Sequence, residues 1–229
     1  LLRFDIVVAN PPFSLDKWGV DEAENDRYNR FWRGLPPKSK GDYAFISHMV
    51  EVALPQRGRI AVVVPHGVLF RGGAEGRIRQ RLIDDNLLDA VIGLPGNLFY
   101  GTGIPACILV LNTAGAAQRG HVLFINADRE YREGKAQNHL RAEDIDKIIH
   151  AYRAGQDIPA YARRVPVAEI KTEDYNCNIR RYVDNAPPPE PHDVRAHLHG
   201  GVPVAEVDAL EHFWANYPAL RDSSFVSRA

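Results

Sequence analysis

The residues best suited to chemistry lie near the start of the chain, where an apolar run ends in Asn10, Pro11, Pro12 and Phe13. The Asn10 side chain offers an oxygen acceptor, and the prolines lack N–H groups, so the backbone there presents carbonyl oxygens with few competing donors. Phe13 adds a flat apolar face. Two acceptors beside an aromatic platform suit a planar ring with an exocyclic amine, such as adenine with its N6 group. The alternative is a proline turn that only ends a strand, since Asn-Pro also marks turns.

This corner would have a chemical effect on such an amine. Two acceptors on one NH2 group pull the nitrogen lone pair out of conjugation with the ring, which makes the nitrogen a better nucleophile. A strand that ends in such a corner would open onto the sheet edge where α/β proteins place ligands. The pattern therefore indicates a site that activates an amino nitrogen.

Basic side chains form a second set of candidates, because they could neutralise DNA phosphates near such a base. Lys38 and Lys40 belong to the polar loop that follows the corner, and Arg71 precedes a charged helix that carries three more arginines, at positions 77, 79 and 81. The formal net charge is −1, so any contact with nucleic acid depends on local patches of this kind. The alternative for the arginines is a solvated helix face, since acidic residues lie on the same helix.

Two glycine-rich stretches have the composition of cofactor loops. These are FYGTG at 99–103 and GGAEG at 72–76. A cofactor loop should follow a strand and open a helix, whereas Ile104, Pro105 and a strand-like run follow FYGTG. We expect FYGTG to connect two edge strands, and we assign no cofactor-binding residue in this chain.

The elements that must position these residues follow from apolar periodicity, which predicts an open α/β sheet with an antiparallel edge. Residues 14–41 are expected to form a loop that is too long for a plain connector. Residues 163–183 are polar and could form two strands. Residues 186–191 have the composition of a stiff linker. Strands are expected at 4–9, 58–65, 87–94, 106–112 and 120–126, and helices at 42–54, 75–85, 140–152 and 204–216.

Composition limits the class of protein. The chain has 229 residues, 45% hydrophobic and 25% charged, as is ordinary for a soluble globular protein. No apolar run reaches the roughly 18–20 residues needed to span a bilayer, and nothing resembles a signal peptide. Cys107 and Cys177 are isolated, which argues against a disulfide framework or a zinc site and suits a reducing, cytoplasmic compartment. The first strand begins at once and without a methionine, as expected for a piece of a longer protein.

Aromatic and histidine side chains leave further alternatives open. Trp18, Phe31 and Trp32 either line a base pocket or pack the long loop onto the domain. The histidines at 192, 197 and 199 are expected to belong to a surface tail, because no cysteine or HExxH partner accompanies them, and no metal site is predicted. The apolar stripe at 207, 210, 213 and 214 either joins a core or docks another subunit.

The Asn10–Phe13 quartet resembles the catalytic motif of amino-group methyltransferases that use S-adenosylmethionine. Longer segments are similar, in the same order, to the modification (M) subunit of type I restriction-modification systems. These segments are FDIVVANPPF (4–13), the run from GDYAF to LVLN (41–112), HVLFINAD (121–128) and DYNCNIRRYV (174–183). A four-residue motif is weak by itself, but this collinear match covers most of residues 4–183.

The resemblance implies a Rossmann-like methyltransferase fold. Residues 1–127 would hold the C-terminal half of the catalytic domain, 128–185 a family-specific extension, and 186–229 a proline-rich linker and a C-terminal helix. It also implies methyl transfer to N6 of a flipped adenine in DNA. By motif position, Asn10 and Pro11 would hold the amine, Pro12 would shape the loop and Phe13 would stack on the base.

The resemblance further implies partners and a methyl donor. The partners are DNA, a specificity (S) subunit that chooses the target sequence, a second M subunit, and optionally a restriction (R) subunit. The donor is S-adenosylmethionine, and the family's Gly-rich cofactor loop lies upstream of the quartet, so this chain alone is expected to be inactive. Two alternatives stay open, namely the same chemistry on RNA or protein, and a non-catalytic interaction fragment.

Overall fold

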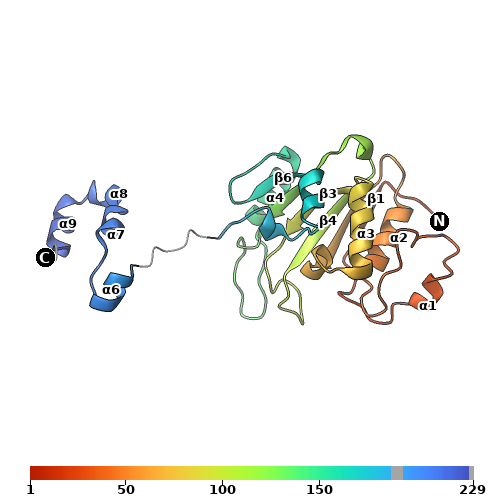
Figure 1. Cartoon of the computed structure of the whole chain (residues 1–229), viewed down its shortest axis with the longest axis horizontal. Helices are drawn as coiled ribbons and strands as arrows, with labels where there is room; N and C mark the ends of the chain where they lie inside the picture. Colours follow the sequence, from red (N-terminus) through yellow and green to blue (C-terminus); the bar gives the residue numbers. More distant parts are fainter. Residues whose placement is uncertain (187–192, 227–229) are drawn as a thin grey trace. The chain divides into compact units, whose positions relative to one another are not determined.

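The computed structural model describes residues 1–186 and 193–226 (Figure 1). The chain divides into two compact units, Leu1–Ala186 and Pro187–Ala229, and each is described by itself. The first unit holds a six-stranded sheet and the second holds short helices. The predicted stiff linker at 186–191 lies outside the described residues, apart from Ala186.

The first unit is built on one mixed sheet with the strand order β1-β2-β4-β3-β5-β6. β1 pairs parallel with β2, β3 pairs parallel with β5, and both β2 and β3 pair antiparallel with β4. It follows that β1, β2, β3 and β5 all point the same way, while β4 and the edge strand β6 point the opposite way. The strands are β1 (Ile6–Ala9), β2 (Arg59–Pro65), β3 (Leu88–Gly93), β4 (Ala106–Asn112), β5 (His121–Asn126) and β6 (Ala162–Pro166).

Helices cover the two faces of this sheet unequally. α2 and α3 bury Ile46, Met49, Ile78 and Leu82 in one core cluster with the inward residues of the sheet, whereas α4 packs Ile148 on the opposite face in a second cluster. The helical segments of this unit are α1 (Val20–Ala23), α2 (Asp42–Val52), η1 (His66–Leu69), α3 (Gly73–Asp84), η2 (Ala116–Gln118), α4 (Ala142–Ala154), α5 (Val167–Thr172) and η3 (Ile179–Arg181). Among the described residues, no helix is long and apolar enough to span a bilayer.

The edge strand β1 is only half covered. Val7 and Ala9 pack against the core on the α2 side of the sheet. Ile6 and Val8 alternate with them on the other face and are 61% and 70% exposed. β1 therefore presents an unpaired edge and an apolar face, the kind of strand that proteins normally cover or pair.

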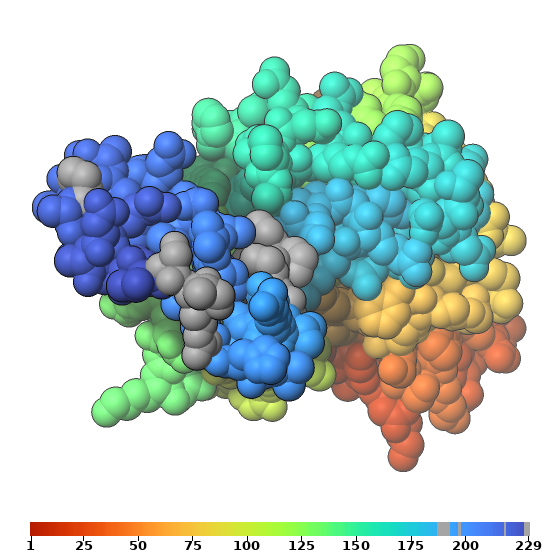
Figure 2. All heavy atoms as spheres, turned by 60° about the vertical axis from the view of Figure 1, so that its left-hand side comes forward, coloured from red at the N-terminus to blue at the C-terminus, as the bar shows by residue number. Residues whose placement is uncertain are grey.

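The segment predicted as an extension shares the core of the sheet. Its β6 pairs with β5, and Ile170, Cys177 and Tyr182 belong to the same buried cluster as α2 and α3. In Figure 2 the surface of this segment lies directly beside α3, and there Lys171 forms an ion pair with Asp84. The extension is thus part of the first compact unit.

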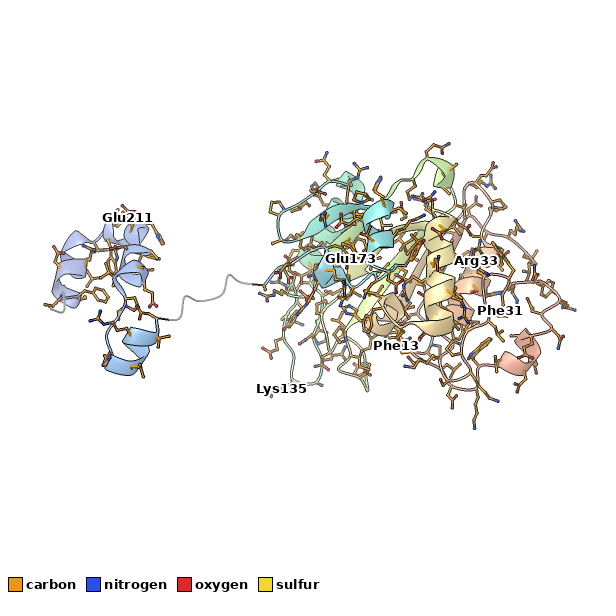
Figure 3. The ribbon with its side chains drawn as sticks, viewed as in Figure 1. Phe13, Phe31, Arg33, Lys135, Glu173 and Glu211 are labelled. Carbon is orange, nitrogen blue, oxygen red and sulfur yellow. The ribbon has the colours of Figure 1, made fainter. Side chains whose placement is uncertain are left out.

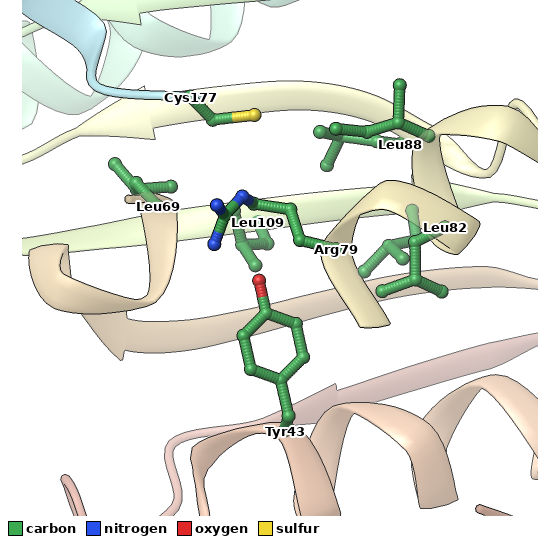
Figure 4. Close-up of a pocket in the computed structure, with 9 residues that line it drawn as sticks. Tyr43, Leu69, Arg79, Leu82, Leu88, Leu109 and Cys177 are labelled. Carbon is green, nitrogen blue, oxygen red and sulfur yellow. The ribbon is translucent and has the colours of Figure 1, made fainter. Parts of the chain in front are cut away.

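A small void of about 10 Å³ lies between α2, α3 and the sheet (Figure 4). Its lining is apolar apart from Tyr43 and the Arg79 side chain. Of the lining residues, Tyr43 uses its hydroxyl to donate to the carbonyl of Val68 at 3.0 Å. The thiol of Cys177 is so deeply buried that its pKa is raised to about 12. A space of this size holds one water molecule at most, so the void belongs to the core.

The structure corrects three predictions about elements. β3 and β4, which FYGTG joins, are interior strands, because β5 and β6 extend the sheet beyond β3. Residues 163–183 form one strand, β6, followed by α5 and η3, because Ile170 turns into the core from a short helix. The helix predicted at 204–216 is divided into α7 and α8 by a turn.

The second unit consists of short helices with little buried surface. Of its apolar stripe, Val207 is buried, whereas Leu210 and Phe213 are exposed. The Trp214 indole donates to the carbonyl of Val207 at 2.6 Å and so closes the turn between the helices. The helices are α6 (Val194–His199), α7 (Val204–Asp208), α8 (Glu211–Trp214) and α9 (Pro218–Ser224).

Candidate active site

The candidate site lies at the edge where the parallel strands end. The carboxyl ends of β1, β2, β3 and β5 meet at one edge of the sheet, because these strands run in the same direction. Four segments follow them, namely the Asn10–Phe13 corner, η1, the loop 94–105 and the segment that starts at Ala127. Open α/β sheets bind ligands at such an edge.

The Asn10–Phe13 corner keeps its acceptors free. Asn10 follows β1 directly and is exposed, and Pro11 is buried. Within the described residues, neither the Asn10 side chain nor the Pro11 carbonyl takes part in a hydrogen bond. Both oxygens can therefore accept hydrogen bonds from an incoming amine.

Phe13 is fixed by an aromatic partner from another loop. The position of Phe13 is labelled in Figure 3, and its ring meets the ring of Phe99 edge to face, with centroids 5.5 Å apart and planes at 72°. Such T-shaped pairs are favourable beyond the area they bury. Phe99 thus limits the orientations that Phe13 can take.

The extension holds the loop that carries Phe99. The Asn138 side chain donates to the carbonyl of Gly96 at 2.9 Å, and its backbone N–H donates to the carbonyl of Asn97 at 2.7 Å. Gln137 donates to the carbonyl of Leu98 at 3.2 Å. The loops 94–105 and 128–140 consequently lie side by side below the sheet in Figure 1.

The glycine-rich stretches lack the surroundings of a cofactor loop. FYGTG runs into β4, so no helix N-terminus opens behind it. GGAEG forms the N-cap and first turn of α3, but its Glu75 already forms an ion pair with Arg71 at 2.7 Å. The described residues therefore do not fit a complete S-adenosylmethionine site.

His66 lies at the same edge and was not among the residues that the sequence analysis singled out. It directly follows β2, and burial lowers the pKa of its imidazole. Its Nε2 atom is buried without a hydrogen-bond partner in the described part of the chain. The position after the second parallel strand was the signal that could have found it, as for Asn10 after β1.

Asp128 lies beyond the end of β5 at the same edge. Burial alone would raise the pKa of this carboxyl, but hydrogen bonds from Asn185 at 2.6 Å and Arg180 at 2.9 Å outweigh it and lower the pKa. Asp128 therefore ties Arg180 and Asn185 to the edge.

The predicted phosphate ligands differ in their surroundings. Lys38 is exposed, and its Nζ lies 3.7 Å from Oδ2 of the exposed Asp21. Lys40 is half-buried. It lies close to the corner because the next residue, Gly41, donates its N–H to the carbonyl of Leu15. Arg71, by contrast, forms ion pairs with the buried carboxylates of Asp42 and Glu75. Its contacts favour a structural role over the predicted contact with DNA.

The remaining arginines of this region also have structural partners, with one exception. Arg79 is buried, and Arg81 donates to the carbonyl of Trp32 at 2.8 Å. Arg77 is exposed and forms no hydrogen bond or ion pair with the described residues. The helix therefore does not present a row of free arginines.

The aromatic residues of the long loop make contacts within the loop and with α2. The Trp18 indole donates to the carbonyl of Pro37 at 2.9 Å, and its ring lies 5.6 Å from that of Phe31. Trp32 donates to Glu51 at 3.0 Å. These contacts support the packing alternative for Trp32, while Trp18 and Phe31 both pack within the loop and line a cavity.

A cavity of about 290 Å³ lies between the same loop and α2. Its walls include Trp18, Phe31, Arg30 and His48. Burial and the neighbouring Arg30 lower the pKa of His48, and Arg30 is itself held by Asp26 at 2.7 Å.

The histidines expected in a surface tail are only partly described. His192 and the side chain of His197 lie outside the described residues, and His199 ends α6. Among the described side chains, no group of three potential ligands could hold a metal ion.

The sheet carries four parallel strands with the antiparallel strand β4 inserted among them, and the Asn-Pro-Pro-Phe corner lies at its carboxyl edge. The family model "N-6 DNA Methylase" matches residues 1–190, and the chain belongs to this family.

Curated relatives give the same family. The type I restriction enzyme MjaVII methylase subunit of Methanocaldococcus jannaschii is 37% identical over 204 residues, covering 85% of this chain and 35% of the relative. The HindI methylase subunit of Haemophilus influenzae is 33% identical over 212 residues, covering 89% of this chain and 45% of the relative. The chain therefore spans less than half the length of these relatives.

Solved structures share the fold. The methyltransferase subunit of a type I restriction-modification system from Streptococcus thermophilus superposes with a TM-score of 0.73 and 42% identity, over 80% of this chain and 38% of that chain. The EcoKI M protein gives a TM-score of 0.60 at 20% identity, over 99% and 51%, a likeness in fold alone. The predicted Rossmann-like methyltransferase fold is confirmed.

Proposed function

We propose that this chain supplies the amine-binding half of a DNA adenine-N6 methyltransferase, the modification subunit of a type I restriction-modification system. The observation that carries the proposal is the pair of unpaired acceptors, Asn10 Oδ1 and the Pro11 carbonyl, beside a Phe13 ring held by Phe99. Curated relatives named as type I methylase subunits support the reaction and the substrate.

Each residue of the corner has its own role in binding a flipped adenine. Asn10 Oδ1 and the Pro11 carbonyl each accept a hydrogen bond from the N6 amine, which concentrates its lone pair for attack on a methyl group. Pro12 shapes the loop, and Phe13 stacks on the base. Flipping the base costs a few kcal/mol, and stacking worth roughly 1–3 kcal/mol offsets much of that cost.

The methyl donor in this proposal is S-adenosylmethionine, bound mainly by another part of the whole protein. The family supports this donor, and the described residues of this chain lack a complete site for it. The exposed apolar face of β1 supports a covering neighbour there in the whole protein. Residues 1–127 are proposed as the catalytic half, 128–185 as a family-specific extension, and 186–229 as a C-terminal part.

The partners belong to the proposal as well. They are DNA near Lys38 and Lys40, an S subunit, a second M subunit and optionally an R subunit, in the cytoplasm. The two free, buried cysteines suit a reducing compartment. The same amine chemistry on RNA or protein is the alternative in substrate, and the relatives' names favour DNA.

The test is Asn10→Ala in the full-length protein assembled with its S subunit, with labelled methyl transfer to DNA as the measurement. We expect at least a ~10²-fold lower rate, the loss seen on removing one preorganised polar contact. Asn216→Ala is the control, because Asn216 is exposed in the other unit and, among the described residues, its side chain donates only to the carbonyl of His212. Near-normal turnover of the Asn10 variant rules out the assignment, and label in RNA or protein instead of DNA selects the alternative.

A further inference from the structure

Ser14, the first residue after the corner, has an unusual backbone. Its φ is +49°, in the left-handed region that residues other than glycine rarely occupy. Such a conformation is strained and persists only where the surroundings impose it. The chain needs this turn at the point where Asn10–Phe13 leaves the sheet edge.

Asp42 supplies the contacts that impose it. The backbone N–H of Ser14 donates to Asp42 Oδ1 at 2.8 Å, and the Ser14 hydroxyl donates to Oδ2 at 3.2 Å. Asp42 is the first residue of α2 and is 1% exposed. A carboxylate that accepts two donors from one residue fixes that residue firmly, because hydrogen bonds to a charged group are the strong ones.

Arg71 fixes Asp42 in turn. Arg71 Nη2 donates to Asp42 Oδ2 at 2.6 Å, while Nε and Nη2 donate to the two oxygens of Glu75 at 2.7 and 3.0 Å. Both carboxylates are buried. A buried carboxylate needs such a partner, since an unpaired buried charge is strongly unfavourable.

Gly67 leaves the room that Arg71 needs. A Cβ atom at Gly67 would lie 2.5 Å from Arg71 Nη1, so any larger residue pushes the guanidinium away. A Cβ atom added at Gly76, on α3, would meet no atom closer than 3.5 Å. These two glycines offer a matched pair of substitutions, one that disturbs Arg71 and one that does not.

We propose that Asp42, held in place by Arg71, is a positioning residue that sets the Asn10–Phe13 corner for methyl transfer. The proposal rests on the proposed function and deepens it. Asp42 acts through Ser14 and touches no substrate, and Arg71 serves this network instead of binding DNA phosphate. The competing role for Asp42 is stabilisation of the first turn of α2, where an acidic residue is generally favourable.

The first test is amide hydrogen exchange on this chain, and it does not depend on activity. In Asp42→Asn and Gly67→Ala, the Ser14 amide is expected to exchange about tenfold faster or more, the factor for one lost charged hydrogen bond. The amides of α2 keep their rates, and Gly76→Ala changes neither. The proposal is wrong if the Ser14 amide keeps its rate, or if the α2 amides accelerate as much as Ser14.

The second test is steady-state methylation by the full-length, assembled enzyme. Asp42→Asn is expected to lower kcat by roughly 10–100-fold with KM for DNA within about twofold, because a misplacement of about 1 Å at a reacting centre costs that much. Ser14→Gly in the same background is expected to restore part of kcat, because glycine adopts a positive φ without strain. A role confined to α2 predicts no rescue, and that result overturns the proposal.

The two proposals fail separately. Normal turnover of Asn10→Ala removes the proposed function and leaves the exchange result standing. Unchanged exchange at Ser14 removes the positioning role and leaves the proposed function standing.

Discussion

Arg79 offers the sharpest test of how the arginines of this region are used. It is 6% exposed, and its guanidinium enters the core between α3 and the sheet (Figure 4). Nε donates to the carbonyl of Tyr175 at 2.7 Å, and Nη1 donates to the carbonyls of Val68 and Arg71 at 3.1 and 2.9 Å. The side chain thus joins α3 to η1 and to the extension, with no carboxylate partner among these contacts.

The change to make is Arg79→Met, which keeps much of the apolar stem and removes the donors. In this variant the Val68 carbonyl still accepts from the Tyr43 hydroxyl. The carbonyls of Arg71 and Tyr175 lose the hydrogen bonds that Arg79 donates to them. Each buried acceptor left unsatisfied costs about 1–3 kcal/mol. Removing the buried guanidinium charge also removes its desolvation cost, which offsets part of that loss. We therefore expect the free energy of unfolding to fall by about 2–4 kcal/mol.

Urea unfolding of this chain, followed by circular dichroism, measures the effect. A loss of this size corresponds to a fall in melting temperature of roughly 4–16 °C for a unit of this length. Arg77→Met is the control, since Arg77 lies on the same helix and is exposed; its effect should stay within about 0.5 kcal/mol. A change below about 1 kcal/mol for Arg79→Met would show that the three carbonyl contacts do not hold the core, and the reasoning would fail.

Three further predictions concern DNA, cofactor and pH. Lys38→Ala in the assembled enzyme should reduce the slope of log K against log salt by about 1, with Lys171→Ala, paired with Asp84, as the control; an unchanged slope removes Lys38 from the DNA contact. Calorimetric titration of S-adenosylmethionine into this chain should give no binding, and clear micromolar binding would mean that FYGTG or another segment holds the cofactor. Hydrogen bonds from Arg30 lower the pKa of Asp26 to about 2. Because the folded pKa lies below the ordinary value of 3.8, this contact stabilises the loop above about pH 4 and is lost as the pH falls toward 2. Loosening of the loop in that window, followed by hydrogen exchange, should be absent in Asp26→Asn, and a loop that loosens equally in both proteins would contradict the assignment.

The sequence by itself determined the local features. Apolar runs predicted the strands β1 to β5 and the helices α2, α3 and α4, because burial on one face imposes a period that can be counted along the chain. The Asn-Pro-Pro-Phe corner was visible as chemistry, since acceptors, missing N–H groups and an aromatic ring follow one another directly. Extended similarity to one family then gave the fold, which the solved relative confirms.

Only the tertiary structure decided which distant residues meet. Phe99 reaches Phe13 because β4 lies between β2 and β3 and the extension fastens the intervening loop. Arg71, Arg77 and Arg79 look alike in sequence, yet one fixes Asp42, one faces solvent and one enters the core. The physical reason is that spacing along a strand or helix sets which way a side chain points, whereas its partner depends on strand order and loop path, and these follow from packing of the whole unit.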